Sequence, residues 1–301
     1  MSLLSTSRES GLQKRLDLAR PRSSWLLREF LREVFREART GRVICFFVCA
    51  LALTAASAAG QSRVAADAQG SMTERRSGRD VLWHIVHDEC VPEAEGKLSG
   101  TPHCVYVDLL EHYVIMKDTR GVAQLLFMPT ELIPGIESPE LLGPDAANFF
   151  QEAWDSRGYL AQFLHKSLPR DEVSLAINSE GGRTQDSLHI HIDCVREDVA
   201  KALREHGGEV KGQWAPFPVP LAGHPYLAMR IDGDLLSTNP FTLLADGIPG
   251  ARGDMGERTL VLVGATFEGR YPGFILLEDH ASGTDRASGE ELQDHSCTIA
   301  N

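Results

Sequence analysis

The order of apolar and polar positions after residue 78 predicts a mixture of helices and strands. Apolar residues at helical spacing predict a helix that starts near Val81 and ends near Cys90. They also predict a long helix over 146–168, which Asp145 can cap, and another that begins near Arg196. Short apolar and alternating runs predict strands over 104–110, 112–116, 122–128, 173–177, 188–194, 259–263 and 271–277. Because helical and strand-like runs are segregated, the pattern favours an α+β fold with a mostly antiparallel sheet.

The run 187–194 separates its side chains completely when it is read as a strand with a period of two. One face carries only apolar side chains, from Leu188, Ile190, Ile192 and Cys194. The opposite, solvent-facing side carries a hydroxyl, two imidazoles and a carboxylate, from Ser187, His189, His191 and Asp193. This arrangement predicts a site built on a rigid strand whose apolar face is buried.

The residues alone leave three interpretations of His189 and His191. A His-x-His metal site would need further ligands, and the remaining candidates are remote in sequence: His112, His224 and His295. Two solvated histidines on an ordinary sheet face are the second interpretation. The third, which we favour, is nucleophilic or acid–base catalysis on a phosphate. It is favoured because the turn at Gly181 and Gly182, with Thr184, supplies backbone and hydroxyl donors beside the imidazoles.

An uncharged segment, residues 43–60, divides the chain into a short N-terminal part and a long exported part. Its length is at the lower limit of a membrane-spanning helix, and its small-residue end is also typical of a cleavable signal, so both alternatives remain. The basic residues before it place its N-terminal side in the cytoplasm. We therefore expect a cytoplasmic segment (1–42), the apolar segment (43–60), a polar linker (61–78) and an exported domain (79–301).

Composition and charge narrow the class of protein. With 43% hydrophobic and 24% charged residues, the chain of 301 residues is typical of a globular protein. The net charge is −12, but residues 1–42 carry ten Lys and Arg against five Asp and Glu, so the remainder carries −17. A region with this much negative charge repels the phosphate backbone of nucleic acids, which argues against general nucleic-acid binding. A local pocket can still hold one phosphate.

Four of the six cysteines lie beyond the apolar segment: Cys90, Cys104, Cys194 and Cys297. An even number in an exported domain predicts disulfides, and four cysteines allow three pairings. We prefer Cys90–Cys104, which closes a short loop containing Pro and Gly, and this leaves Cys194–Cys297. Buried free thiols are the alternative.

The strand and the turn before it resemble the histidine-triad superfamily. That signature has a glycine, a hydroxyl residue two positions later, and three histidines that alternate with apolar residues. Gly182, Thr184, His189 and His191 match it in place, whereas Ser187 stands where the first histidine would be. Further segments are similar to the bacterial CDP-diacylglycerol pyrophosphatase family, over roughly residues 82–297: 125–130, 135–139, 174–179, 182–185, 223–228 and 293–297.

The resemblance implies hydrolysis of CDP-diacylglycerol to CMP and phosphatidate. His189, the middle histidine, would attack phosphorus and form a transient cytidylyl-histidine. His191 would donate to the phosphate oxygens, and Thr184 with nearby backbone N–H groups after Gly182 would hold the developing charge. Asn178 is a predicted phosphate or nucleotide contact. The chemistry demands no metal or cofactor, and we predict none.

The position of Ser187 is the departure from the triad. A serine can orient His189 through one hydrogen bond but cannot carry positive charge, and Asp193 on the same face could substitute electrostatically in part. Two alternatives to the lipid substrate are a pyrophosphatase for soluble nucleotide esters and a tethered binding protein with a decayed site. For a lipid substrate, an anchor in the bacterial inner membrane with the domain on the periplasmic side would raise the effective concentration.

Overall fold

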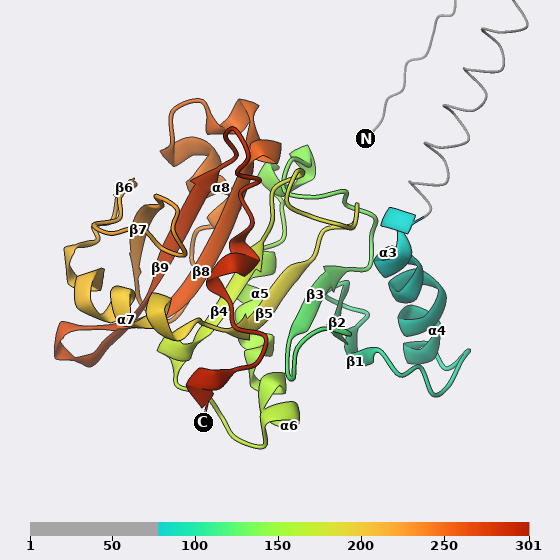
Figure 1. Ribbon diagram of the computed structural model, residues 1–301. Helices are drawn as coiled ribbons and strands as arrows, with labels where there is room; N and C mark the ends of the chain where they lie inside the picture. The colour runs from blue at the N-terminus through green and yellow to red at the C-terminus, as the bar shows by residue number, and fades with distance from the viewer. Residues whose placement is uncertain (1–77, 301) are drawn as a thin grey trace, which may run out of the picture. The chain divides into compact units, whose positions relative to one another are not determined.

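A nine-stranded antiparallel sheet is the framework of residues 78–300, the part of the chain that the computed structural model describes (Figure 1). The strands lie in the order β1-β2-β3-β5-β4-β8-β9-β7-β6, and each neighbouring pair is antiparallel. Their bounds are β1 (Cys104–Asp108), β2 (Tyr113–Lys117), β3 (Leu125–Pro129), β4 (Val173–Ile177), β5 (Ile190–Cys194), β6 (Ala215–Pro216), β7 (Leu227–Asp232), β8 (Arg258–Phe267) and β9 (Tyr271–His280). The expected α+β class with a mostly antiparallel sheet is therefore confirmed.

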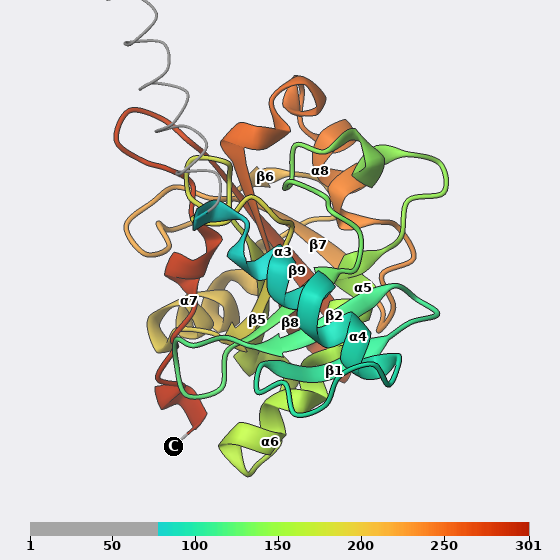
Figure 2. The same cartoon turned by 90° about the vertical axis from the view of Figure 1, so that its right-hand side faces the viewer.

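Short helices pack on both faces of this sheet (Figures 1 and 2). The α-helices are α3 (Val81–Ile85), α4 (Val91–Ala94), α5 (Phe149–Asp155), α6 (Leu160–Leu164), α7 (Glu197–His206) and α8 (Pro240–Gly247). A π-helical turn, η1 (Val86–Cys90), joins α3 to α4. The 3-10 turns are η2 (Pro139–Leu142), η3 (Ser156–Tyr159), η4 (Arg170–Glu172), η5 (Gly207–Glu209), η6 (Ala251–Gly253), η7 (Met255–Glu257), η8 (Glu268–Arg270), η9 (Gly289–Leu292) and η10 (Thr298–Ala300).

Two predicted helices differ from those observed. The long helix over 146–168 is interrupted by η3, where Gly158 with its low helix propensity lies, and it ends at His165, whose φ is +55°. Its first cap is Asn148, whose side chain accepts from the Gln151 N–H at 3.3 Å, not the predicted Asp145. The first helix, which was expected to end near residues 90–92, continues through η1 into α4 and ends at Ala94. The pattern also missed β6, β7 and α8.

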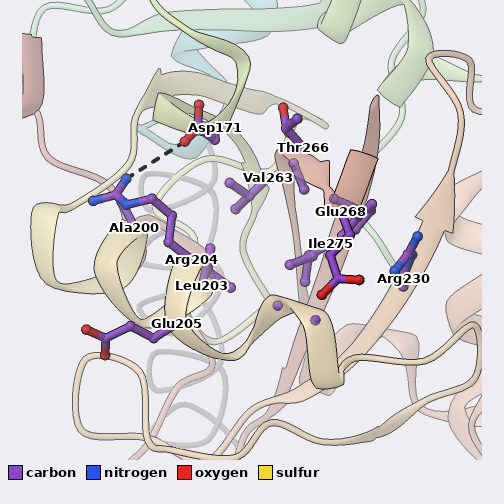
Figure 3. Close-up of a pocket in the computed structure, with 15 residues that line it drawn as sticks. Asp171, Ala200, Leu203, Arg204, Glu205, Arg230, Val263, Thr266, Glu268 and Ile275 are labelled. Carbon is purple, nitrogen blue, oxygen red and sulfur yellow. Dashed lines mark ion pairs between the residues drawn. The ribbon is translucent and has the colours of Figure 1, made fainter. Parts of the chain in front are cut away.

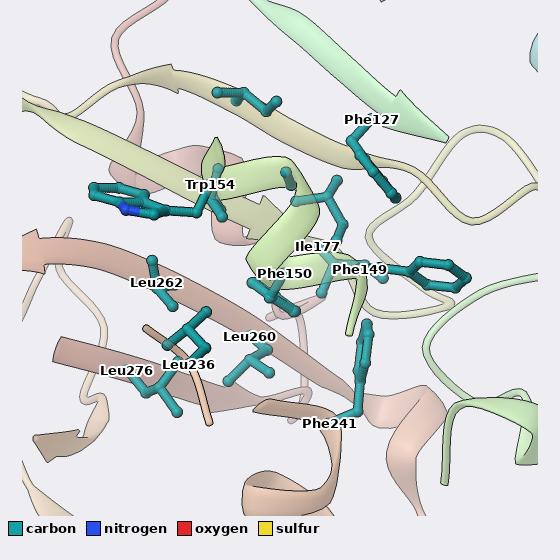
Figure 4. Packing of buried hydrophobic residues seen from close by; sticks show 14 of the residues in the cluster. Phe127, Phe149, Phe150, Trp154, Ile177, Leu236, Phe241, Leu260, Leu262 and Leu276 are labelled. Atoms are coloured by element: carbon teal, nitrogen blue, oxygen red, sulfur yellow. The ribbon is translucent and has the colours of Figure 1, made fainter. Parts of the chain in front are cut away.

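Apolar side chains form three clusters, a large one on one face of the sheet and two smaller ones on the opposite face. The larger cluster packs α5 and α8 against one face, with Trp154 edge-on to Phe274 at 5.0 Å between ring centroids (Figure 4). It contains Leu188, Ile190, Ile192 and Cys194, the apolar face that the period-two pattern predicted. The opposite face carries two smaller clusters, one under α3 to α4 on β2 and β3, and one under α7 on β4, β8 and β9.

No helix within residues 78–300 is long and apolar enough to cross a membrane. The predicted apolar segment 43–60, the segment 1–42 before it and the linker up to residue 77 lie outside the described residues.

Two disulfides tie peripheral segments to the sheet. Cys90 in η1 is joined to Cys104 at the start of β1, and Cys194 at the end of β5 is joined to Cys297 near the C-terminus. This is the pairing that we preferred from the sequence. The second bond closes the longer loop, with a sequence separation of 103 against 14.

We expect removal of the second disulfide to cost more stability than removal of the first. In the chain-entropy model, a loop of about 100 residues contributes about 4.7 kcal/mol and one of about 15 residues about 3 kcal/mol. Urea unfolding of the double variants Cys194→Ser/Cys297→Ser and Cys90→Ser/Cys104→Ser measures both losses under the same conditions. An equal or smaller loss for the Cys194 pair would contradict this prediction.

Candidate functional site

His191 lies on β5 and His189 directly precedes this strand, and the pair occupies the gap between the two smaller clusters. His191 pairs in register with Leu126 of β3 and Ala176 of β4, and these two neighbours belong to different clusters. The site face was predicted to be open to solvent, and this is wrong. His189 is 7% exposed, His191 4%, and Asp193 is fully buried. The prediction failed because a C-terminal segment, residues 281–300, crosses the sheet in front of this face (Figure 1).

Backbone contacts hold the C-terminal segment on the sheet. The Asp294 N–H donates to the Cys194 carbonyl at 2.9 Å, and the His295 carbonyl accepts from Val122 at 2.8 Å. Gly289 allows a very close approach, because a Cβ at this position would lie 2.6 Å from the Val261 side chain on β8. Together with the Cys194–Cys297 bond, these contacts bring η9 over the histidines.

The position of the proton on His189 follows from a single hydrogen bond. Its Nδ1 lies 2.6 Å from the Ser187 carbonyl oxygen, which can only accept, so Nδ1 carries the proton. Burial lowers the pKa of His189, which keeps the ring neutral. Nε2 therefore holds a free lone pair, which is the form that a nitrogen nucleophile requires. The backbone of Ser187 provides this orientation, where the sequence had indicated its hydroxyl.

His191 has the complementary tautomer. Its Nδ1 lies 2.9 Å from the amide nitrogen of Gln124, which donates to it, so the proton of the neutral ring is on Nε2. Burial lowers the pKa of His191 to about 3, against the attraction of the Glu290 carboxylate. Nε2 is buried and has no hydrogen-bond partner among the described residues. A buried donor without a partner costs about 1–3 kcal/mol, so this N–H is available for a bound acceptor.

Glu290 from η9 is the anion beside the pair. Its Oε1 lies 3.3 Å from His191 Nδ1 and accepts from the Gln124 amide at 3.3 Å, and its Oε2 accepts from Asn178 at 2.6 Å. Burial favours a higher pKa for Glu290, but the attraction of His191 in its charged form and the hydrogen bonds from Asn178 and Gln124 hold the pKa below its usual value. Glu290 is therefore the ionised neighbour of the two rings.

A third histidine joins the site from the C-terminal segment. His295 Nδ1 donates to the buried Asp193 carboxylate at 2.7 Å, and its Nε2 lies 3.8 Å from Glu290 Oε1. The hydrogen bond to Asp193 raises the pKa of His295. Asp193 is thus held by His295 of the C-terminal segment.

Charged pairs fix the turn that precedes β5. Arg183 donates to both oxygens of Glu137 at 2.7 Å, which joins the turn to the loop 134–139. Arg79, at the start of the domain, donates to both oxygens of Asp186, also at 2.7 Å. Bidentate pairs of this kind are geometrically specific. Two segments that carried the family resemblance, 135–139 and 182–185, therefore contact each other directly.

The predicted substrate-binding residues divide into two groups. Asn178 and Ser187 line the same small pocket as His189, together with Gly135 and Arg183. Both ends of the Asn178 amide are also bonded within the protein, since Oδ1 accepts from Ser288 at 3.2 Å. Gly182 packs against the carbonyls of 286 and 287, and Thr184 is exposed on the turn; neither lines that pocket.

Sequence reasoning missed Gln124 and Glu290. Gln124 lies inside the run 122–128 that was predicted as a strand, directly before the observed β3, and a polar residue within this apolar run was the available signal. Glu290 gave no signal, because it lies in an acidic stretch far from the motif. Of the other candidate histidines, His295 reaches the site, whereas His112 lies at the turn between β1 and β2 and His224 lies in a separate acidic cluster.

The described residues do not form a metal site around His189 and His191. Neither histidine belongs to a group of three or more close His, Cys, Asp or Glu ligand atoms in residues 78–300. One such group consists of Asp193, Cys194 and Cys297, but these two cysteines are joined in a disulfide. A separate cavity of about 520 Å³ lies between α7 and the strands β8 and β9 (Figure 3), and none of its lining residues belongs to the histidine site.

The arrangement pairs a free nucleophilic nitrogen with an unpartnered donor. The two rings lie edge to face, with their centroids 4.9 Å apart. A phosphate group that reached both rings would meet the lone pair of His189 Nε2 and the N–H of His191 Nε2. Attack on phosphorus with stabilisation of the developing charge is the chemistry that such a pair can perform.

Comparison with known proteins identifies the family of this chain. A sequence model of the CDP-diacylglycerol pyrophosphatase family matches residues 77–301. The chain is 40% identical over 228 residues to a CDP-diacylglycerol pyrophosphatase of Yersinia pestis, an alignment that covers 75% of this chain and 86% of that relative. The chain therefore belongs to the CDP-diacylglycerol pyrophosphatase family of hydrolases.

Proposed function

We propose that the protein hydrolyses the pyrophosphate bond of CDP-diacylglycerol to CMP and phosphatidate, with His189 as the nucleophile. The observation that carries the mechanism is the opposite protonation of the two buried rings, with the lone pair on His189 Nε2 and the proton on His191 Nε2. The family assignment supports the substrate, since both matches are to CDP-diacylglycerol pyrophosphatases.

In the first step, His189 Nε2 attacks the phosphorus of the cytidylyl group. A nitrogen–phosphorus bond forms, the bond from phosphorus to the bridging oxygen breaks, and phosphatidate leaves with the bridging oxygen and its electron pair. The positive charge on the substituted ring is stabilised by Glu290 and by the bond from Nδ1 to the Ser187 carbonyl. The His191 N–H donates to a non-bridging oxygen, where charge develops.

In the second step, water attacks the same phosphorus. An oxygen–phosphorus bond forms, the bond to His189 breaks and returns its lone pair, and the proton from water passes to the solvent as CMP is released. Splitting the displacement in two lowers each barrier.

The remaining predicted contacts have supporting roles in this proposal. Asn178 and Ser187 lie beside His189 around a narrow crevice that is closed to water in this structure, so in this proposal they contact the phosphate when the crevice opens. Asn178 also positions Glu290. Thr184, exposed on the turn after Gly182, would contact the part of the substrate that extends beyond the pocket.

Replacing His189 should remove catalysis, whereas replacing His191 should only weaken it. With detergent-dispersed CDP-diacylglycerol, we expect CMP release by the unaltered protein, a loss of kcat beyond about 1,000-fold in His189→Ala, and a loss of about 100-fold in His191→Ala. His206→Ala, a histidine on α7 paired with Glu209, is the matched control and should leave kcat unchanged.

The identity of the attacked phosphorus is tested by labelling. CDP-diacylglycerol with a radiolabelled cytidine should transfer label to the unaltered protein on quenching in alkaline SDS, and not to His189→Ala. Transfer of a glycerol label instead would place the attack on the other phosphorus. CMP release from soluble CDP esters but not from the lipid would reject the lipid substrate, and release from neither would reject the enzyme proposal.

The acid limb of kcat/KM should have its midpoint below pH 6.5. His189 must be neutral to attack, and burial lowers its pKa, so protonation removes the lone pair only below the usual histidine value of about 6.5. The pH profile of kcat/KM reports this for the free enzyme. A midpoint above 6.5 would mean that a different group controls the acid limb and would contradict the assignment.

We further propose that residues 43–60 anchor the protein in the bacterial inner membrane, with the catalytic domain on the periplasmic side. Two disulfides in the domain support an oxidising compartment. The full chain should sediment with membranes after carbonate washing, and protease added to spheroplasts should digest the domain. A variant lacking residues 1–60 should remain in the cytoplasm, and its cysteines should stay reduced there. Protection from protease in intact spheroplasts would contradict this orientation.

A further inference from the structure

We propose that His224, Asp279, Asp285 and Glu291 form a binding site for a divalent transition-metal cation such as Zn²⁺, separate from the histidine pair. Four distinct segments contribute these residues. His224 lies in the turn before β7, Asp279 is near the end of β9, Asp285 follows in the next turn, and Glu291 lies in η9.

The donor atoms converge on one point. From His224 Nδ1, the distances are 2.9 Å to Glu291 Oε1, 3.5 Å to Asp285 Oδ2 and 3.9 Å to Asp279 Oδ2. The ligand atoms of His224, Asp279 and Glu291 all lie within 4.8 Å of one another. Ligands at 2.0–2.2 Å from a tetrahedral cation are roughly 3–4 Å apart, so small side-chain movements would complete the coordination.

The carboxylate of Asp279 points independently to a ligand. It is 6% exposed, and its Oδ1 accepts from the backbone N–H of His280 at 2.8 Å. Its Oδ2 is buried, faces the cluster and has no hydrogen-bond partner among the described residues. A buried carboxylate oxygen without a partner, next to other carboxylates, is strongly unfavourable unless a proton or a cation neutralises it.

The balance of charge favours a cation over a proton alone. Three carboxylates face one imidazole, and the structure gives no ion pair between Arg or Lys of residues 78–300 and any of the three. A divalent cation that contacts all three carboxylates would neutralise this excess of negative charge.

The donor set selects the kind of metal. One imidazole nitrogen with carboxylate oxygens suits zinc or manganese, whereas magnesium and calcium prefer oxygen ligands alone. Glu291 also accepts from the Tyr226 hydroxyl at 2.6 Å, a hydrogen bond that would orient it as a ligand. The site borders a cavity of about 300 Å³, which provides a route for the ion.

The cation site and the catalytic site share η9. Glu291 faces His224, and its neighbour Glu290 faces His191 and Asn178. A cation bound to Glu291 would therefore fix the short turn that positions Glu290. This makes the ion a structural support for the catalytic site and gives it no part in the chemical steps.

The test is zinc binding by the purified full chain after chelator treatment. Calorimetric titration with ZnCl₂ should give a site that Asp279→Asn and His224→Gln each weaken by at least tenfold. The matched control His206→Gln alters an exposed histidine that is also paired with a glutamate, and should leave the affinity unchanged. Circular dichroism checks that each variant is folded.

Thermal unfolding gives a second readout. Zinc should raise the midpoint of the unaltered protein and not that of Asp279→Asn. Without zinc, Asp279→Asn should unfold at the same or a higher temperature, because it removes a buried charge. The proposal would be overturned if zinc did not bind, or if all variants bound it with equal affinity. It would also be overturned if only His191→Gln lost binding, because the zinc site would then be at the catalytic pair.

Discussion

The contact of residues 281–300 with the sheet is the interaction on which the site depends. The face of β5 that carries His189 and His191 is polar, and without this segment it would lie between two apolar clusters in contact with water. The segment is held by backbone hydrogen bonds to the Cys194 carbonyl and to Val122, and by the disulfide to Cys297. Its close approach at Gly289 brings η9 directly above the strands.

Burial by this segment determines the protonation of the histidines. Exposed imidazoles would titrate near their usual pKa, whereas both rings here are held neutral because the charged form is poorly solvated. Local hydrogen bonds then give each ring a different tautomer: the Ser187 carbonyl accepts from His189, and the Gln124 amide donates to His191. One ring thereby becomes an electron-pair donor and its neighbour a hydrogen-bond donor.

The same segment supplies the charges around the pair. Glu290 stays ionised because Asn178, Gln124 and the histidines together outweigh its burial, and His295 is bonded to the carboxylate of Asp193. These contacts support the proposed binding of an anionic substrate to an acidic domain, because the negative groups near the histidines are already engaged within the protein.

The sequence by itself determined the local features. The period-two pattern over 187–194 correctly assigned Leu188, Ile190, Ile192 and Cys194 to the core, because alternation along a strand depends only on backbone geometry. The strand 173–177 and the late hairpin of β8 and β9 were also found, since their apolar runs are bounded by turns. The family motif identified the two histidines for a similar reason, because it is contiguous in the chain.

The tertiary structure alone decided which segment covers the site and which charged side chains surround it. Glu290 is separated from Asn178 by 112 residues, and Asp193 from His295 by 102, so neither pair has a local signal. The polar face was expected to be open because alternation distinguishes the two faces of a strand but says nothing about which distant segment packs on them. The long helix over 146–168 failed for a related reason, as tertiary packing tolerated a 3-10 turn at Gly158 that periodicity could not detect. Residue types therefore singled out the two histidines as candidates, while their burial, tautomers and charged neighbours depended on chain segments far apart in sequence.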